Sequence, residues 1–415
     1  MQQDGASKGW DTSYEWKIIL VLSLTFGLVG LDRFILPVLF PAFMDELGLT
    51  YEDLGNLVGI LAVFWGLSAF AMGFLSDKVG RRKVLIPAVV IFSLMSVFTG
   101  MAGGLVGLLV IRAIMGLAEG PVASTGVAVA VEASHPKRRG MNNGIFQCMI
   151  SLFGNALGPL IATQLLLVVD WRAVFMLVGI PGLIMAAVMF FLVREPDHHK
   201  QEIVSDAPPA KPVERTRFVD LFKHRNVPLA MLTLMCAMGG VFIMGAMMPN
   251  YLTDYLGLSL QDMGVITSAI GFGGALGQFA MPTLSDFIGR KLTILISYIL
   301  AGIFLWLFTQ AGADNLSTLF WLLFFAALFN FSALATLAGP VAAEAAPVGM
   351  IASVAGLVIG AGEVFGGGVA PIIAGQIAGS SGIQHVFTFA IAGLAVGFVI
   401  ALFLKETAPR KTGSV

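Results

Sequence analysis

The segment GFLSDKVGRRK, residues 73 to 83, is a short polar stretch between two long apolar segments of the sequence. The segment PTLSDFIGRK, residues 282 to 291, repeats its pattern L-S-D-x-x-G-R, again between two apolar segments. A second matching pair lies further along each half, VAVEASHP (129 to 136) and VAAEAAP (341 to 347). Matching segments in the same order predict two parallel copies of one structural unit, in which Glu132 and Glu344 occupy equivalent positions.

The composition of the chain indicates the solvent in which it folds. Of its 415 residues 57% are hydrophobic and only 12% are charged, and the mean hydropathy is +0.88. A soluble domain has about twice this charged fraction, so the sequence predicts an all-α membrane protein whose main surroundings are the lipid bilayer. The 24 basic and 25 acidic residues nearly cancel, which argues against a nucleic-acid partner.

A bilayer core needs about 20 apolar residues for each helical crossing, and windows of this length recur along the chain. We predict twelve transmembrane helices. Their approximate ranges are 17–41, 52–76, 84–103, 105–133, 141–168, 172–193, 227–252, 261–285, 291–311, 316–343, 350–378 and 383–404.

The basic residues indicate which side of the membrane each loop faces. Apart from Arg33, Arg112 and Arg172, the lysines and arginines fall on the loops, tails or helix ends of one side. Because cytoplasmic loops are enriched in these residues, we predict a multi-pass protein of the cell inner (plasma) membrane with both termini cytoplasmic. We also expect the protein to be a monomer.

The segment 194–226 is polar and rich in proline and charge, so we predict a cytoplasmic linker that ends in a short interfacial helix. It would divide the chain into an N-terminal six-helix half, 1–193, and a C-terminal six-helix half, 227–415. The adjacent His198 and His199 lie in this linker, but no further ligands stand at zinc-like spacing. We therefore expect no metal site.

At the repeated motif the sequence resembles the major facilitator superfamily. The residues that match the superfamily's signature between spans two and three are Gly73, Leu75, Ser76, Asp77, Gly80, Arg81 and Arg82. The resemblance implies two pseudo-symmetric six-helix halves that alternate between outward-open and inward-open forms. The charges of both motif copies could lock the cytoplasmic helix ends together. This predicted conformational gate consists of Asp77, Arg81, Arg82, Glu132, Asp286, Arg290 and Glu344. A motif that merely anchors its loop in the cytoplasm is the alternative interpretation.

In this superfamily spans two, five, eight and eleven line the interface between the halves. Each of these spans contains a GxxxG pair, which would allow close packing of helix backbones. The pairs are Gly55 and Gly59, Gly154 and Gly158, Gly273 and Gly277, and Gly362 and Gly366.

Charged residues within the membrane are the main candidates for function. A charge near the centre of a membrane helix costs about 2.5 to 3.5 kcal/mol. We therefore expect Asp32, Arg33, Arg112 and Glu119 to pair with one another and to face a polar cavity. At about 1.5 Å per residue, spans one and four would bring Asp32 and Arg112 to the same depth. A purely structural network of ion pairs is the alternative.

This combination resembles the anion:cation symporters, one family of the superfamily. The matching pattern is D-R in span one and R-x-x-x-G-x-x-E-G in span four. The resemblance implies that Asp32 and Glu119 carry protons, while Arg33 and Arg112 bind a substrate carboxylate. The segment DRFILPVLFP lacks the small polar residues that usually follow D-R in that family, which favours an anion with few hydroxyl groups.

Further polar residues lie near mid-depth in the predicted spans. Ser151, Asn155 and Asn330 could hydrogen-bond a substrate, although a role in helix packing is equally compatible with the sequence. Glu363 has no evident basic neighbour in its own half. It is either a third proton site or a residue kept neutral by its surroundings.

The sequence therefore predicts a secondary active transporter, not an enzyme, that carries a small organic anion together with protons. The proton gradient would supply the energy, and we expect no cofactor. The alternative is a proton-linked exporter of drugs or lysolipids. GNALGPLIAT, residues 154 to 163, partly matches an antiporter signature, and D-R with G-x-x-E also resembles spinster-type lysolipid carriers.

Overall fold

The computed structural model describes residues 10–135, 138–194, 218–346 and 351–412, and these residues form helices and no strand. The helices before the predicted linker are α1 (Thr12–Phe43), α2 (Tyr51–Val79), α3 (Arg81–Thr99), α4 (Leu105–Ala133), α5 (Arg139–Met149), η2 (Ile150–Leu157), α6 (Gly158–Leu165) and α7 (Trp171–Leu192). Within the predicted linker lies η4 (Phe218–Lys223). The later helices are α8 (Asn226–Asn250), η5 (Tyr251–Tyr255), α9 (Leu260–Ile288), α10 (Arg290–Gln310), α11 (Leu316–Thr336), η6 (Leu337–Val341), α12 (Ala342–Ala345), α13 (Ile351–Ala361), η7 (Gly362–Val369), α14 (Ala370–Ser381), η8 (Ile383–His385), α15 (Val386–Ala401) and α16 (Pro409–Thr412).

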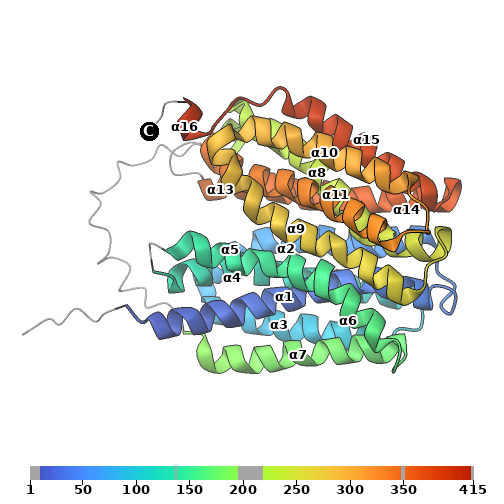
Figure 1. Cartoon of the computed structure of the whole chain (residues 1–415). Helices are drawn as coiled ribbons and strands as arrows, with labels where there is room; N and C mark the ends of the chain where they lie inside the picture. Colours follow the sequence, from blue (N-terminus) through green and yellow to red (C-terminus); the bar gives the residue numbers. More distant parts are fainter. Residues whose placement is uncertain (1–9, 136–137, 195–217, 347–350, 413–415) are drawn as a thin grey trace, which may run out of the picture.

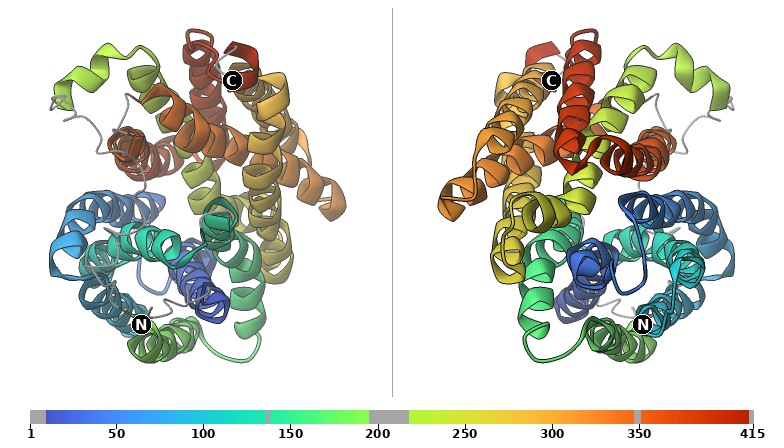
Figure 2. Two further views of the ribbon diagram at one scale, coloured as in Figure 1. Left: turned by 90° about the vertical axis from the view of Figure 1, so that its left-hand side faces the viewer. Right: turned by 90° about the vertical axis from the view of Figure 1, so that its right-hand side faces the viewer.

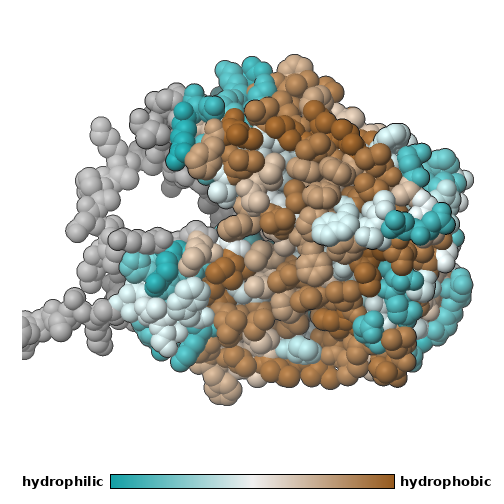
Figure 3. All heavy atoms as spheres, in the orientation of Figure 1, coloured by the Kyte–Doolittle hydropathy of each residue, from teal (hydrophilic) through white to brown (hydrophobic). Residues whose placement is uncertain are grey.

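The long helices run across an apolar belt. Within the described residues, eleven helical stretches are long and apolar enough to cross a membrane. Together with α2, which has 29 residues, they account for the twelve predicted membrane helices. Figure 3 shows a broad hydrophobic band between two hydrophilic ends, as expected for a protein that spans a bilayer.

Four of these stretches change from α-helix to π-helix along their length. The π-helical segments are η2, η5, η6 and η7. The segments η2 and η7 each have eight residues and lie in spans five and eleven, which are equivalent in the two predicted halves. A π-helical segment rotates the helix that follows it and often occurs at a functional site.

The helices up to α7 and those from α8 onward form two groups, which are seen from both ends in Figure 2. Most of the predicted linker lies outside the described residues, so its boundaries remain a prediction. Its last part is the short 3₁₀-helix η4, in which Leu221 is buried. Figure 1 shows that α1 begins, and α16 lies, at the same end of the molecule, which we call the predicted cytoplasmic end.

The two copies of the sequence motif build the same turn. Gly80 joins α2 to α3 at φ 106°, and Gly289 joins α9 to α10 at φ 109°. Residues with a side chain rarely adopt positive φ, which explains the glycine in both motifs. The following arginines, Arg81 and Arg290, form ion pairs of 2.9 Å with Glu132 and Glu344, respectively. The internal repeat of the sequence is therefore a repeat in three dimensions.

The two groups of helices touch closely at the other end, the predicted outer end. A Cβ atom at Gly55 of α2 would lie 2.5 Å from the carbonyl oxygen of Pro371, and one at Gly375 would lie 2.5 Å from that of Tyr51. Tyr51 Oη also donates a hydrogen bond of 2.9 Å to Asp254 Oδ2 in η5. The two groups of helices are therefore in close contact at the predicted outer end.

Only one of the four GxxxG pairs lies between the two groups of helices. Gly55 and Gly59 pack on α14 and η7, whereas the pair of span five packs on α1, that of span eight on α11 and that of span eleven on α8. In α9 it is Gly264 and Gly271 that contact the first group, at Thr163 and Ala156. The spacing predicted close backbone packing but not which neighbour each glycine would meet.

Candidate functional site

The centre of the molecule contains an ion pair that joins the two groups of helices. Arg33 Nη2 of α1 donates to Glu363 Oε2 of η7 at 2.8 Å, and the two side chains are only 4% and 7% exposed. The sequence singled out both residues but did not pair them. Because Glu363 has no basic neighbour in its own half, its partner could be found only from the packing of the halves.

Asp32 points away from this pair. Its Oδ1 accepts a hydrogen bond of 2.8 Å from Ser96 Oγ of α3. Consecutive residues of an α-helix point about 100° apart, so Asp32 faces α3 while Arg33 faces the second half. The expectation that the four charged residues pair with one another is therefore wrong. In the described structure, no two of Asp32, Arg33, Arg112 and Glu119 form an ion pair.

Arg112 of α4 is held by backbone oxygens. Its Nη2 donates to the Arg33 carbonyl at 3.0 Å and its Nη1 to the Asp32 carbonyl at 3.2 Å, while its Nε lies 3.4 Å from the Leu57 carbonyl. Pro37 follows Arg33 by four residues and has no N–H to bond that carbonyl, so Arg112 supplies the missing donor. The predicted common depth of Asp32 and Arg112 is correct, but here the guanidinium holds α1 in place.

Glu119 lies on the same helix as Arg112 and is completely buried. Neither of its carboxylate oxygens has a hydrogen-bond partner among the described residues. Its charge interacts with those of Asp32, Arg112, Arg33 and Glu363. Burying a carboxylate without a direct partner is costly, which keeps Glu119 a candidate proton site.

Three aromatic rings surround the guanidinium of Arg33. Its Cζ lies 4.5 Å from the ring centroid of Phe242, 5.2 Å from that of Trp65 and 6.0 Å from that of Phe34. The rings of Phe34 and Phe242 stack with centroids 6.1 Å apart. Trp65 and Phe242 were not predicted, because aromatic residues are common in every apolar span.

A hydrogen bond also crosses between the halves at η2. Gln278 Nε2 of α9 donates to Ser151 Oγ at 3.1 Å. Asn155 lies one turn further along η2, and its Oδ1 would be 3.6 Å from a Cβ atom at Gly245 of α8. Ser151 and Asn155 thus face the second half, as a substrate-binding role requires. Gln278 was missed, although an amide within an apolar span is a recognisable signal.

Asn330, by contrast, packs on a neighbouring helix. When its amide is oriented to satisfy both of its polar atoms, it donates to the Ala237 carbonyl and accepts from the Val241 N–H, each at 3.1 Å. Ala237 and Val241 are one helical turn apart in α8. Of the two interpretations left open for this residue, the geometry favours helix packing within the second half.

The predicted gate residues lie at the predicted cytoplasmic end, where each described pair joins helices of the same half. Besides Glu132, Arg81 contacts Ser76 Oγ at 2.8 Å. Arg290 contacts Asp286 at 2.6 Å in addition to Glu344. Arg82 donates to the carbonyl of Phe190 and lies 4.5 Å from its ring centroid. The side chain of Asp77 is outside the described part of the structure. The predicted role of these residues as a gate between the halves remains untested.

Glu406 was not predicted from the sequence. It lies beside Arg290, at the second copy of the motif. Its carboxylate accepts hydrogen bonds from the N–H groups of Arg290, Lys291, Thr407 and Ala408. Burial alone would raise the pKa of Glu406, but these four donors hold it below the ordinary value. The contact at the start of α10 is therefore retained at neutral pH and is lost only when acid protonates the carboxylate.

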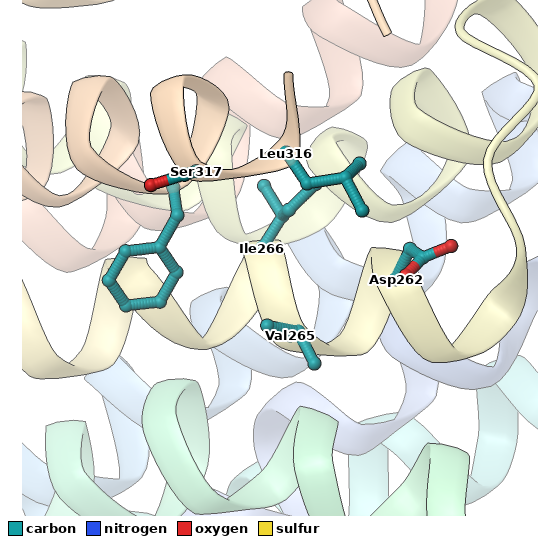
Figure 4. Close-up of a pocket in the computed structure, with 6 residues that line it drawn as sticks. Asp262, Val265, Ile266, Leu316 and Ser317 are labelled. Carbon is teal, nitrogen blue, oxygen red and sulfur yellow. The ribbon is translucent and has the colours of Figure 1, made fainter. Parts of the chain in front are cut away.

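A separate recess of about 190 Å³ opens at the predicted outer end, between α9 and α11 (Figure 4). Its described lining consists of Asp262, Val265, Ile266, Leu316, Ser317 and Phe320. No basic side chain lies in this lining, so the recess is no candidate for binding an anion.

Comparison with known proteins identifies the family. The sequence profile described as Major Facilitator Superfamily matches residues 22–249 and 230–415, which together include the repeated motif and the buried charges. The chain belongs to the Major Facilitator Superfamily. It is thus a multi-pass membrane transporter and not an enzyme, and the fold expected from the motif is confirmed.

Within this superfamily the chain is similar to carriers of organic acids. It is 29% identical to the hexuronate transporter of Bacillus subtilis (strain 168) over 278 residues, which are 66% of this chain and 65% of that protein. It is 25% identical to the 4-hydroxybenzoate transporter of Pseudomonas aeruginosa over 325 residues, which are 72% of each chain.

A solved structure shares the fold. The inward-facing, unoccupied bacterial homolog of the human lysosomal transporter Spinster superposes with a TM-score of 0.74, and the match covers 94% of this chain and 97% of that one. The two sequences are 18% identical, so the likeness concerns the fold alone.

Proposed function

We propose that this transporter carries a small organic anion, with a carboxylate group, together with protons by alternating access. The observation that carries the proposal is the buried pair of Arg33 and Glu363 between the two halves. An arginine at mid-depth in a membrane protein offers a carboxylate a two-pronged, charge-assisted hydrogen bond. In this structure, the hydrogen bond with the arginine is made by a carboxylate of the protein itself.

Competition for Arg33 would couple the anion to the proton. When a substrate carboxylate binds the guanidinium, Glu363 loses its partner and remains in an apolar environment. The loss of an opposite charge favours the protonated acid, so anion and proton bind together. When the anion leaves, Glu363 releases its proton and pairs with Arg33 again. The coupling free energy of such linked sites is typically about 1 to 3 kcal/mol.

The other candidate residues have supporting roles in this proposal. Asp32 and Glu119 remain candidate proton sites, and Ser151 and Asn155 are candidate substrate contacts. Arg112 would act through its hold on the backbone of α1, which fixes the position of Arg33. The names of the two carriers of organic acids support a carboxylate as the transported group.

The alternative function is proton-linked export of drugs or lysolipids. Its support is the shared fold with the Spinster homolog and the D-R pair in α1. Fold alone does not specify a substrate, however, and many unrelated functions use one fold. The guanidinium of Arg33 suits a compact anion better than a cationic drug.

A counterflow experiment tests the proposal. Purified protein in liposomes that contain unlabelled compound should accumulate labelled carboxylate and should not accumulate lysolipid or cationic drug. Arg33→Lys keeps the charge but loses the planar fork, so we expect carboxylate affinity to fall about tenfold or more. Arg172→Lys, at the outer surface, is the matched control. Unchanged affinity in Arg33→Lys would show that Arg33 does not bind the anion.

A further inference from the structure

Aromatic rings form much of the surroundings of Arg33. Besides Glu363, its guanidinium lies beside the rings of Phe34, Trp65 and Phe242. On the side of the second half lie two glycines. A Cβ atom at Gly245 would lie 3.2 Å from Phe34 and 3.6 Å from Asn155 Oδ1, and one at Gly367 would lie 3.0 Å from Phe242 and 3.1 Å from Glu363 Oε2. Each hydroxyl of a sugar acid loses water on entry and needs a partner, and the faces of the three rings supply none.

The same surroundings fit a flat ring that carries one carboxylate. Aromatic rings pack on one another in offset or edge-on geometry, and a guanidinium stacks on aromatic faces. Phe34 and Phe242 already stack, and both lie beside the guanidinium. A ligand whose carboxylate reached Arg33 would bring an attached ring against these faces.

Trp65 provides a second observation that indicates a ligand. The residue is 7% exposed, and its indole Nε1 has no hydrogen-bond acceptor among the described residues. Buried polar groups nearly always have a partner, and an unpaired donor is costly. Beside an arginine, a carboxylate is the acceptor that would satisfy both groups.

From this arrangement we infer that the substrate is an aromatic monocarboxylate. Its carboxylate replaces that of Glu363 at Arg33, and its ring packs against Phe34, Trp65 and Phe242. The inference rests on the proposed function and narrows it from organic anions in general to one class. It assigns Trp65 and Phe242 as residues that determine specificity.

Binding to the full-length protein in lipid nanodiscs tests the substrate class with three probes. Benzoate has the ring and the carboxylate, cyclohexanecarboxylate has a saturated ring of similar size, and glucuronate has hydroxyls. We expect benzoate to bind about three- to tenfold more tightly than cyclohexanecarboxylate, because only its ring is aromatic. Glucuronate should compete weakly or not at all.

The outcomes separate this inference from the proposed function. If glucuronate binds as tightly as benzoate or more tightly, the aromatic class is wrong while transport of an organic anion stands. If benzoate and cyclohexanecarboxylate bind equally, the aromatic class is also overturned. If none of the three carboxylates binds, the proposed function fails together with the inference.

Two variants test the roles of Phe242 and Trp65 in ligand binding and in the preference for benzoate over cyclohexanecarboxylate. Phe242→Leu keeps an apolar side chain but removes a ring, so the preference for benzoate over cyclohexanecarboxylate should shrink. Trp65→Phe keeps a ring but removes the N–H group, and should weaken both ligands equally without changing their ratio. Phe304→Leu is the matched control, because its ring stacks on Phe325 and Phe329, away from the site. An unchanged ratio in Phe242→Leu would refute the assignment.

Discussion

At the scale of single residues, Glu363 occupies the place that we assign to the substrate. A buried ion pair is rarely the most stable solution, since apolar side chains of similar size often do as well or better. The pair of Arg33 and Glu363 is therefore better explained by a partner that is exchanged during function than by stability. Exchange requires that the displaced carboxylate can take up a proton.

We expect Glu363→Gln to separate substrate movement from the proton gradient. The amide can still hydrogen-bond Arg33 but cannot exchange a proton. Exchange of labelled and unlabelled substrate between equal pools should persist, while accumulation driven by a pH gradient should fall to a ratio of about one. In the wild type, a gradient of about one pH unit supports at most about tenfold accumulation with one proton per anion.

Glu46→Gln, which alters a carboxylate of the outer loop, is the control for this measurement. Asp32→Asn and Glu119→Gln examine the other two candidate proton sites in the same liposomes. Uphill accumulation by Glu363→Gln at the wild-type level would remove Glu363 from the proton path.

At the scale of the helices, the π-helical segments determine which residues come into contact. Both η2 and η7 begin near mid-span and contain candidate site residues, Ser151 and Asn155 in one and Glu363 in the other. Hydropathy and spacing predicted the helices themselves, because about 20 apolar residues must cross the bilayer. They could not predict the π-helical turns, which shift the faces of the helices that follow and so decide the contacts between halves.

The outer contact between α2 and η5 is a second feature at this scale. Asp254 accepts hydrogen bonds from Tyr51 of the first half and from Asn250 and Thr253 of the second. The bond from Tyr51 must break whenever the outer end opens. We expect Tyr51→Phe to weaken closure by about 1 kcal/mol, which changes the ratio of closed to open forms about fivefold.

Spin labels at Asp45 and Asp314, in outer loops of different halves, would measure this ratio as a distribution of distances. Tyr51→Phe should increase the population at long distance. Tyr255→Phe removes a hydroxyl from the tyrosine that follows Asp254 in η5, and it should leave the distribution as it is. Identical distributions for both variants would show that the Tyr51 bond does not contribute to closure.

At the scale of the whole molecule, the sequence predicted the repeated architecture better than the site. The motif of residues 73 to 83 and its copy led directly to equivalent turns, because each turn is local in sequence. The ion pairs join each motif to a glutamate 51 or 54 positions later, and the second pair of matching segments predicted that these glutamates are equivalent. The site depends on contacts between halves that share no local signal. Arg33 and Glu363 are 330 positions apart, and the hold of Arg112 on α1 depends on a proline four residues beyond Arg33.

The pair of Arg33 and Glu363 also has an electrical consequence. The empty site carries one positive and one negative charge, which cancel. The loaded site carries the arginine, a monovalent anion and a neutral, protonated Glu363, and these also sum to zero. Neither form would therefore move net charge through the membrane field, where one elementary charge is worth about 2.3 kcal/mol per 100 mV.

We expect uptake to be insensitive to a membrane potential imposed with potassium and valinomycin at equal pH on both sides. A pH gradient in the same liposomes serves as the positive control and should stimulate uptake. Uptake that rises or falls with voltage would mean that proton and anion do not move one for one. With electroneutral transport, a cell that loses its membrane voltage but keeps its pH difference would continue to take up the anion.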